Sequence, residues 1–464
     1  MSGPTILFNI THGFQARMLL RSEIAESLLA RGTRLVIASA AAREPYFVQE
    51  FTHPQITLED MRGKFSRVES HLINLRQYFL MNPSLGATLN HKNEVFRRER
   101  PRRYWFARAV NSVLGRIPPL RRAYQAGEAI AFPGTEWDDL LRRYQPDLVV
   151  TGTPGLNRND VHLMRAARRA RIETATVMLS WDNLSSKGYM GARPDHLLVW
   201  SDLMAHEAVM YHSFPRERIQ WCGAAQFDYY YQFRQRFDRD AWRKREGIPE
   251  GRPLIVYGTI NPWIMPHEIH TVRQIVEAIE SGKFKVKPLL WIRMHPQAVR
   301  GEFSCAVDPF RKLAGPSVRI EEPPVQSEKL AWDLPRRDIE HLAQLMAAAD
   351  VVVTPCSTLS IDAACVDTPI INVFFDGDAA VHPALSARRF MSYTHYAHIL
   401  ETGGIAKAMN IDDFVRMTDA YVENPRLDSD GRARILQQQF NRLDGKAGAR
   451  TAELLAELAV RRNK

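Results

Sequence analysis

The sequence predicts two α/β domains, each built on a parallel sheet with helices on both faces, that face each other across a cleft. Three observations lead to this fold class. Short apolar, β-rich runs alternate with helical segments along most of the chain, as they do in parallel sheets. Most of these runs are apolar on both faces, which is typical of strands that helices cover on two sides. The 464 residues also exceed the size at which one hydrophobic core stops growing.

The first series of strands defines an N-terminal domain, which we place at residues 1–225. A helix is expected over 17–30, between the first two strands. The opening residues reach His12 before any long apolar run forms, so they predict a first strand rather than a signal peptide. The predicted strands of this domain are 5–10, 34–38, 147–151, 174–179 and 196–200.

The second series begins after a polar, aromatic segment, 226–251, which we predict to be the interdomain linker. It defines a C-terminal domain at 252–420, followed by a helical segment at 421–464 whose last helix we expect to pack back across the boundary. Ligands of open parallel sheets bind at the carboxyl ends of the strands, so the residues that follow each strand are the candidates for a site. The predicted strands are 253–257, 288–294, 318–320, 351–354 and 369–374.

The bulk composition is that of a globular protein, with 45% hydrophobic and 25% charged residues. A formal net charge of +10 favours anionic partners, which include nucleic acid, acidic lipid and nucleotide phosphates. The four cysteines form no CxxC pair and no zinc pattern, so they predict reduced thiols in a cytoplasmic protein. No stretch approaches the ~20 apolar residues of a membrane span. The cysteines are Cys222, Cys305, Cys356 and Cys365.

The segment 62–124 lacks strand signals, and its second half is densely basic. Apolar and aromatic side chains alternate there with arginines, so the part from 92 to 122 is suited to lie on an anionic membrane surface. A helical insertion with a solvated basic face is an equally good interpretation. A nucleic-acid surface is less favoured, because no recognised binding motif accompanies the charge. The arginines are Arg97, Arg98, Arg100, Arg102, Arg103, Arg108, Arg116, Arg121 and Arg122.

Arg293 and His295 end an apolar strand that reads LLWIRMHP over 289–296. Side chains alternate along a strand, so these two are expected to point to the same side. Arginine binds phosphate oxygens with a planar fork, and the pair therefore predicts a site for an anionic ligand at the carboxyl edge. The alternative is a structural role, in which Arg293 caps a helix and His295 bonds to backbone.

A second motif, ADVVVTPCSTLSIDA over 349–363, predicts a strand, a tight turn and a helix that opens near Ser357 or Thr358. A helix start offers free N–H groups to a phosphate, and the two hydroxyls would add donors. Asp362 lies one turn further on the same face, where it could accept from a ribose or glycerol hydroxyl. Ordinary helix capping also explains these residues. The neighbouring Arg293 and His295 favour the phosphate site.

Two loops of the N-terminal domain hold candidate bases. Asp182 follows the 174–179 strand, where a carboxylate can deprotonate an acceptor hydroxyl, and Lys187 can pair with it or with a donor phosphate. A turn in which Asp182 caps the next helix is the alternative. His12, after the first strand, is a second base candidate or a simple turn histidine, and Gly13 allows a tight turn there.

Other ligand patterns are weak or missing from the sequence. Neither a GxGxxG fingerprint nor a Walker A loop occurs. Asp376 and Asp378 resemble a metal-binding DxD pair, but without further ligands they predict a polar loop and no metal site.

Together these motifs resemble those of nucleotide-sugar-dependent glycosyltransferases of the GT-B fold, particularly the CDP-glycerol glycerophosphotransferase-like branch. The RMHP of 293–296 and the STLSID of 357–362 resemble that branch's strand end and helix start, and 195–228 resembles the run into the GT-B interdomain hinge. The resemblance covers about half of the chain. The residues that it implies to hold the donor's diphosphate and adjacent hydroxyls are Arg293, His295, Ser357, Thr358 and Asp362.

One loop departs from this branch. The branch typically carries Trp-His-Gly where this chain reads Trp181, Asp182 and Asn183, so Asp182 would occupy the place of the base histidine. The departure favours sugar transfer with a carboxylate base over glycerol phosphate transfer.

We therefore expect a glycosyltransferase, inverting and independent of metal or cofactor, that moves a sugar from a nucleotide-activated donor to a surface-glycan or lipid-linked acceptor. Asp182 or His12 would be the base, and the C-terminal residues would stabilise the leaving phosphate. The protein would work at the inner face of a membrane if the basic segment binds lipid. Three alternatives stay open: a CDP-glycerol glycerophosphotransferase, a nucleotide-sugar epimerase, and a non-catalytic sugar-nucleotide-binding protein.

Overall fold

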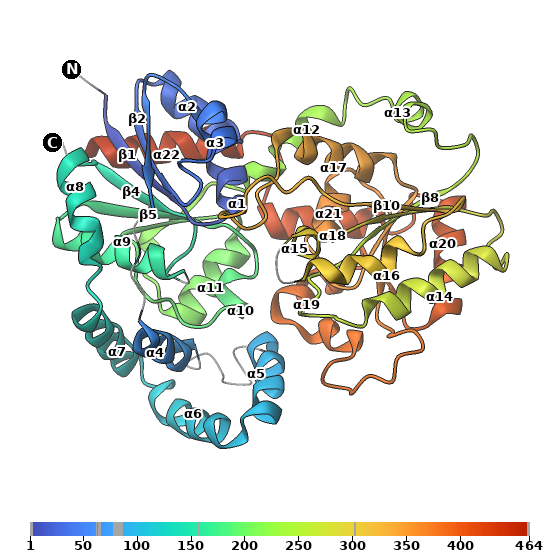
Figure 1. The fold of residues 1–464 in the computed structure, drawn as a ribbon, viewed down its shortest axis with the longest axis horizontal. Helices are drawn as coiled ribbons and strands as arrows, with labels where there is room; N and C mark the ends of the chain where they lie inside the picture. The colour runs from blue at the N-terminus through green and yellow to red at the C-terminus, as the bar shows by residue number, and fades with distance from the viewer. Residues whose placement is uncertain are drawn as a thin grey trace.

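The computed structural model describes residues 3–61, 63, 66–77, 87–155, 157–300 and 303–461, which form two α/β halves side by side (Figure 1). Each half is built on one sheet whose neighbouring strands all run parallel. Helices pack on both faces of each sheet. The predicted fold class, two Rossmann-like domains that face each other, is confirmed.

The N-terminal sheet has seven strands in the order β3-β2-β1-β4-β5-β6-β7. All residues of the central strands β1 and β4 are buried, because helices cover the sheet on two sides. The two strands that the sequence analysis missed, β3 and β7, are the edges of this sheet. The strands are β1 (Thr5–Ile10), β2 (Arg34–Ser39), β3 (Ile56–Asp60), β4 (Leu148–Thr151), β5 (Glu173–Val177), β6 (His196–Val199) and β7 (Ile219–Trp221).

The C-terminal sheet has six strands in the order β10-β9-β8-β11-β12-β13. Its central strands β8, β9 and β11 are also wholly buried. The one strand missed here, β13, is again an edge strand. The strands are β8 (Leu254–Gly258), β9 (Leu289–Arg293), β10 (Val318–Glu321), β11 (Val351–Thr354), β12 (Ile370–Val373) and β13 (Ala406–Ala408).

The helix predicted over 17–30 is interrupted. After α1 the chain forms a π-helical turn at Ala16–Leu20, and α2 starts anew where the Ser22 hydroxyl accepts from the backbone N–H of Ile24 at 3.3 Å. The other helices of this half pack on its sheet or follow its strands. They are α1 (Gly13–Gln15), α2 (Glu23–Ala30), α3 (Pro45–Phe51), α8 (Asp138–Tyr144), α9 (Arg158–Arg169), α10 (Asn183–Ser186) and α11 (Asp202–His212).

The helices of the C-terminal half alternate with its strands as a doubly wound fold requires. They are α14 (Glu268–Glu280), α15 (Pro296–Val299), α16 (Asp308–Arg311), α17 (Arg336–Ala348), α18 (Leu359–Cys365), α19 (Thr394–Glu401) and α20 (Ile411–Glu423).

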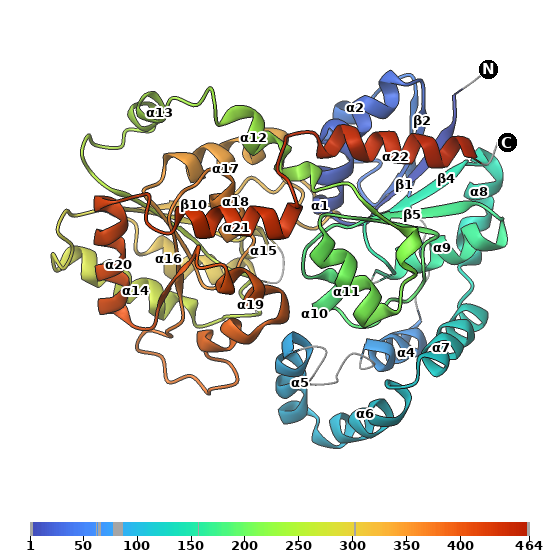
Figure 2. The same cartoon turned by 180° about the vertical axis from the view of Figure 1, so that it is seen from behind.

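The described part of the predicted insertion is helical and forms an arc below the N-terminal sheet (Figures 1 and 2). Residues 62, 64, 65 and 78–86 of that segment lie outside the described residues. A buried ion pair joins the first and last helices of the arc, since Arg76 Nε donates to Glu128 at 2.9 Å. Arg76 also donates to the carbonyl of Tyr189 at 2.7 Å. The helices are α4 (Arg67–Gln77), α5 (Ala87–Glu99), α6 (Pro101–Leu114) and α7 (Pro118–Ala131).

The predicted linker and C-terminal segment contain more helices than expected. Two helices, α12 (Asp228–Phe233) and α13 (Arg239–Arg245), lie within 226–251, and the expected last helix is two, α21 (Ser429–Phe440) and α22 (Ala447–Arg461). The break occurs where Asn441 and Gly445 take positive φ. Helix α22 packs against α2 and so returns to the N-terminal half (Figure 2).

One loop of the C-terminal half reaches into the N-terminal half; we call residues 325–333 the strap. Leu330 is fully buried in the N-terminal core, and the carbonyl of Ala331 accepts from Gly13 N at 2.8 Å. Asp333 accepts from Arg21 Nη1 at 2.5 Å and from the Tyr46 hydroxyl at 2.7 Å. A Cβ on Gly13 would lie 2.4 Å from the Asp333 Cα, so this close approach, rather than a special turn, requires the glycine.

Among the described residues no helix is both long enough and apolar enough to cross a bilayer. The four cysteines are free thiols in the structure.

Candidate active site

Trp332 of the strap lies between two histidines that follow strands of different halves. Its ring centroid is 4.7 Å from that of His12, after β1, and 4.9 Å from that of His295, after β9, with an edge-on geometry in both pairs. Trp332 has a φ of 59°, which costs a bulky residue about 1–3 kcal/mol and is held by its surroundings. The carboxyl ends of the two sheets therefore meet at this group of rings.

Backbone hydrogen bonds set the tautomer of both histidines. Nδ1 of His12 accepts from Phe14 N at 3.2 Å, and Nδ1 of His295 accepts from Gln297 N at 3.1 Å. A neutral imidazole has one proton, which these bonds assign to Nε2. The two rings thus present N–H donors rather than acceptors, which suits phosphate oxygens. The alternative of His12 as a base would require it to give up its bond to Phe14.

The same surroundings keep both rings uncharged. Burial, with the charge of the nearby Lys187 as a second cause, lowers the pKa of His12 to about 4. Burial also lowers the pKa of His295 to about 4, with His12 as a second cause. At neutral pH both histidines are therefore neutral hydrogen-bond donors.

Arg17 is a cation in this region that the sequence analysis missed. It belongs to the π-helical turn after α1, and such turns are frequent at functional sites. Its Nε and Nη2 atoms are buried and find no hydrogen-bond partner among the described residues. Burial raises the pKa of Tyr230 and of Asp362, and the charge of Arg17 opposes this rise in both, so the guanidinium lies near them. Buried donors without partners are costly, and an anion between the halves would satisfy them.

Two of the predicted donor-binding residues form ion pairs or hydrogen bonds with other side chains of the protein. Arg293 is buried, pairs with Glu321 through Nη1 and donates from Nη2 to Asp338 at 2.6 Å. Asp362 is buried and accepts from the Tyr230 hydroxyl at 2.5 Å, and burial raises its pKa. These contacts are not the helix caps of the structural alternative, and donor binding by the two residues stays a prediction.

Ser357 and Thr358 lie half-buried between β11 and α18, as predicted from the sequence. The Ser357 hydroxyl accepts from Leu359 N at 3.3 Å, and the next three backbone N–H groups bond to the carbonyls of Ser357 and Thr358 at 2.8–3.2 Å. The first turn of α18 therefore satisfies several of its own donors. Phosphate binding by the two hydroxyls stays a prediction.

Asp182 and Lys187 flank the short helix α10 in the loop after β5. The two carboxylate oxygens of Asp182 accept from the hydroxyls of Ser180 and Ser186, each at 2.7 Å, and Lys187 Nζ lies 3.2 Å away. Lys187 also acts on the pKa of His12, so this loop reaches the ring group. A carboxylate oxygen accepts more than one hydrogen bond, so these contacts do not prevent Asp182 from accepting a proton from an acceptor hydroxyl. That role stays a prediction.

The acidic loop is polar, as expected. Asp376 lies 3.0 Å from His267, and Asp378 lies 2.7 Å from His270. Over the ranges that the structure describes, no group of three or more histidine, cysteine or carboxylate side chains is arranged to hold a metal ion.

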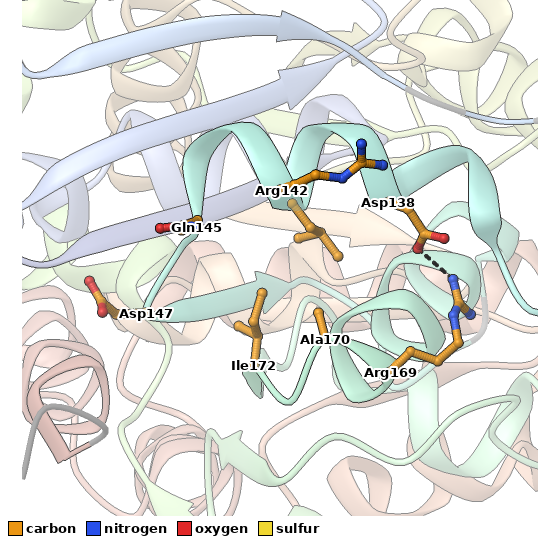
Figure 3. Close-up of a pocket in the computed structure, with 8 residues that line it drawn as sticks. Asp138, Arg142, Gln145, Asp147, Arg169, Ala170 and Ile172 are labelled. Atoms are coloured by element: carbon orange, nitrogen blue, oxygen red, sulfur yellow. Dashed lines mark hydrogen bonds and ion pairs between the residues drawn. The ribbon is translucent and has the colours of Figure 1, made fainter.

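A hollow of about 660 Å³ lies away from this group of rings (Figure 3). It opens between the end of α8 and the end of α9, beside Asp147 at the amino end of β4, and an Asp138–Arg169 ion pair of 2.6 Å spans its rim. Ligands of parallel sheets bind at the opposite, carboxyl edge, so we do not assign this hollow to the site.

The sequence matches no protein-family model and no curated protein. The fold is similar to that of a glycosyltransferase from Rickettsia africae, with a TM-score of 0.52, 11% identity and 99% of each chain covered. A UDP-GlcNAc 2-epimerase from Neisseria meningitidis bound to UDP-GlcNAc gives a TM-score of 0.56 at 10% identity, over 98% of this chain and 100% of that one. The epimerase of Methanocaldococcus jannaschii with UDP-GlcNAc and UDP gives 0.53 at 12%, over 98% and 99%.

At these identities the likeness establishes the fold, which is of the GT-B type over the whole chain. The likeness agrees with the GT-B resemblance of the motifs, and it gives no support to a CDP-glycerol glycerophosphotransferase-like branch.

Proposed function

We propose that the chain is an enzyme that binds a nucleotide-activated sugar between its halves and transfers the sugar to a surface-glycan or lipid-linked acceptor. The observation that carries the proposal is Arg17, whose two buried donors have no partner in the described part of the chain and lie near the C-terminal half. A diphosphate between the halves would supply the missing acceptors. Similar folds have been solved with UDP or UDP-GlcNAc bound, which supports this class of donor.

In the proposed reaction, fixed donors stabilise the leaving group. Arg17 and the Nε2–H groups of His12 and His295 take up the negative charge that develops on the diphosphate as its bond to the sugar breaks. The acceptor oxygen bonds to the anomeric carbon, and its proton passes to Asp182. Lys187, released from Asp182 by that proton, then pairs with the diphosphate.

A second candidate function is epimerisation of a UDP-sugar without an acceptor. It is favoured by the fold neighbours, several of which are UDP-GlcNAc 2-epimerases that cover nearly the whole chain. The two candidates share the donor site and differ in whether the sugar leaves the nucleotide for good.

One experiment separates these functions. The purified protein is incubated with UDP-, GDP- and CDP-activated sugars and with CDP-glycerol, each with and without a panel of glycan and lipid-linked acceptors. Transfer predicts free nucleotide only in the presence of an acceptor, and activity that survives EDTA. A new sugar-nucleotide isomer without an acceptor would establish the epimerase, and turnover of CDP-glycerol alone would establish glycerophosphate transfer. Binding without any turnover would contradict all three.

A further inference from the structure

The outermost helix of the arc, α6, turns an apolar face to solvent. Trp105, Phe106 and Val113 are exposed by 55%, 68% and 60%, and Ala109 between them is exposed as well. At 100° per residue these four positions fall within one sector roughly 100° wide. A surface helix normally turns such a face inward, so α6 is oriented for a partner outside the chain.

The opposite side of α6 explains this orientation. Tyr104 is buried, and its hydroxyl accepts from Arg108 at 3.0 Å. The arc is anchored elsewhere, since α5 bonds to the C-terminal half through Thr88 and Thr394 at 2.8 Å. Figures 1 and 2 both show α6 at the outer side of the arc, away from the two sheets.

Positive charge surrounds this apolar face, and the exposed Arg102 of the first turn lies within the same sector. The sequence from 87 to 122 contains ten arginines and lysines against two glutamates, and so carries most of the net charge of the chain. Ile117 and Leu120, at the start of α7, extend the apolar surface with exposures of 42% and 39%. The exposed arginines of this surface are Arg97, Arg98, Arg100, Arg102, Arg116 and Arg122.

We propose that α6 and the start of α7 form a docking surface for an anionic lipid bilayer, with Trp105, Phe106 and Val113 entering the headgroup region. Aromatic and aliphatic side chains gain from leaving water there, while the arginines pair with lipid phosphates and keep their charge at the surface. The positive charge of the six exposed arginines favours an anionic partner, because an uncharged protein surface would form no ion pairs with them. The surface is separate from the donor site, so the lipid-docking proposal does not depend on the proposed reaction.

Vesicle co-sedimentation of the full-length protein tests the proposal. We expect binding to vesicles of phosphatidylglycerol mixed with phosphatidylcholine and little binding to phosphatidylcholine alone. The triple substitution Trp105→Ser, Phe106→Ser and Val113→Ser should weaken binding at least ~10-fold. Trp263→Ser is the matched control, because Trp263 is 66% exposed on the C-terminal half. Equal binding by the triple variant would overturn the proposal.

The charge is tested with its own pair of variants. Replacing Arg98, Arg102 and Arg116 by serine should weaken binding on the order of 100-fold. Three exposed arginines of the C-terminal half, replaced in the same way, give the same net charge and should leave binding within a few-fold of the parent protein. Loss of binding in both sets, tighter binding to RNA or DNA than to vesicles, or a dimer that the triple substitution dissociates would each contradict a lipid surface. The control arginines are Arg273, Arg388 and Arg426.

Discussion

Nε and Nη2 of Arg17 have no hydrogen-bond partner among the described residues, and the carboxylate of Asp362, on which the charge of Arg17 acts, already has one. Asp362 accepts from Tyr230, and burial raises its pKa, so it is a weak counter-ion for the guanidinium. Arg17 is half-buried, and its two buried donors cost free energy as long as no acceptor reaches them.

Arg17→Ala is expected to weaken UDP binding by roughly 10–100-fold, since hydrogen bonds to charged groups contribute about 1.5–3 kcal/mol. Arg17→Lys should recover part of the loss, because it restores the charge without the fork. Arg31→Ala, at an exposed position after α2, is the control. Calorimetric titration with UDP measures all three, and unchanged affinity in Arg17→Ala would remove the main support for the donor site.

The neutral histidines make a second prediction, on pH. Both pKa values lie at about 4, so neither ring changes charge between pH 6 and 8. Affinity for a UDP-sugar, whose diphosphate diester does not titrate in this range, should therefore be nearly constant from pH 6 to 8. A tenfold fall in affinity on raising the pH through 6.5 would mean that the rings bind as imidazolium. The variant His295→Gln should keep the flat profile at a lower affinity.

The sequence predicts which residues lie at the ends of strands better than it predicts the hydrogen-bond partners of those residues. His12 and His295 were placed correctly at the carboxyl edges, because those positions follow directly from the strand pattern. The partners of Arg293 lie 28 and 45 residues away, and the partner of Asp362 lies 132 residues away, so no local pattern reveals that they are engaged. Arg17 was missed because it lies in what reads as an ordinary amphipathic helix.

Among the elements, the strap decides how the two halves are held. Arg21 and Asp333 are both almost fully buried, whereas the Arg336–Glu26 pair, which also joins the halves, is exposed at both ends. A buried, hydrogen-bonded pair contributes far more than an exposed one when one partner is removed. The strap therefore holds the two halves together more strongly than the exposed Arg336–Glu26 pair does.

Asp333→Ala is expected to open the cleft and to lower the unfolding free energy by about 3 kcal/mol, because Arg21 loses a buried partner. Small-angle scattering should show a larger radius of gyration without ligand, and UDP should reduce it again. Arg336→Ala is the matched control and should change neither quantity. Lower stability with an unchanged radius would show that the strap contributes only packing.

The strands that the sequence failed to predict share one property: all three are sheet edges. β3 alternates half-buried and exposed residues, and β7 and β13 have three residues each, so none has the continuous apolar run of a covered strand. The central strands were found because burial on both faces requires such a run. The break between α21 and α22 was not predicted from the sequence. One of its two positive-φ residues is Asn441, which marks a helix end less specifically than a glycine such as Gly445 does.

For the whole molecule, three buried histidines and three buried carboxyls act in opposite directions on stability. Burial lowers the pKa of His12, His212 and His295 to about 4, so the unfolded chain binds more protons below pH 6.5 and acid destabilises the fold. Burial raises the pKa of several carboxyls, three of them to about 7 or 8, so the folded protein binds more protons there and alkali destabilises the fold. The three are Asp160, at about 7, and Glu207 and Glu268, each at about 8.

The histidines and the carboxyls change the unfolding free energy in opposite directions between pH 4.5 and 6.5. Above pH 6.5 only the carboxyls change it. We therefore expect the unfolding free energy to fall from pH 6.5 to 8, by up to about 1.4 kcal/mol per pH unit for each carboxyl that is still protonated in the fold. Glu268 is the clearest case, because it stays buried at the start of α14 while it accepts from Ile260 N at 3.1 Å and from the Tyr257 hydroxyl at 3.1 Å.

Glu268→Gln removes the titration and keeps an acceptor oxygen for Ile260, so it should flatten the fall above pH 6.5 by the share of one carboxyl. Glu277→Gln, at an exposed position of the same helix, is the control and should leave the slope unchanged. Urea unfolding at pH 6.5, 7.25 and 8 measures the slope for the three proteins. A parallel slope in Glu268→Gln would mean that Glu268 ionises in the folded state, and the carboxylate would then need a cation or water that its buried contacts do not supply.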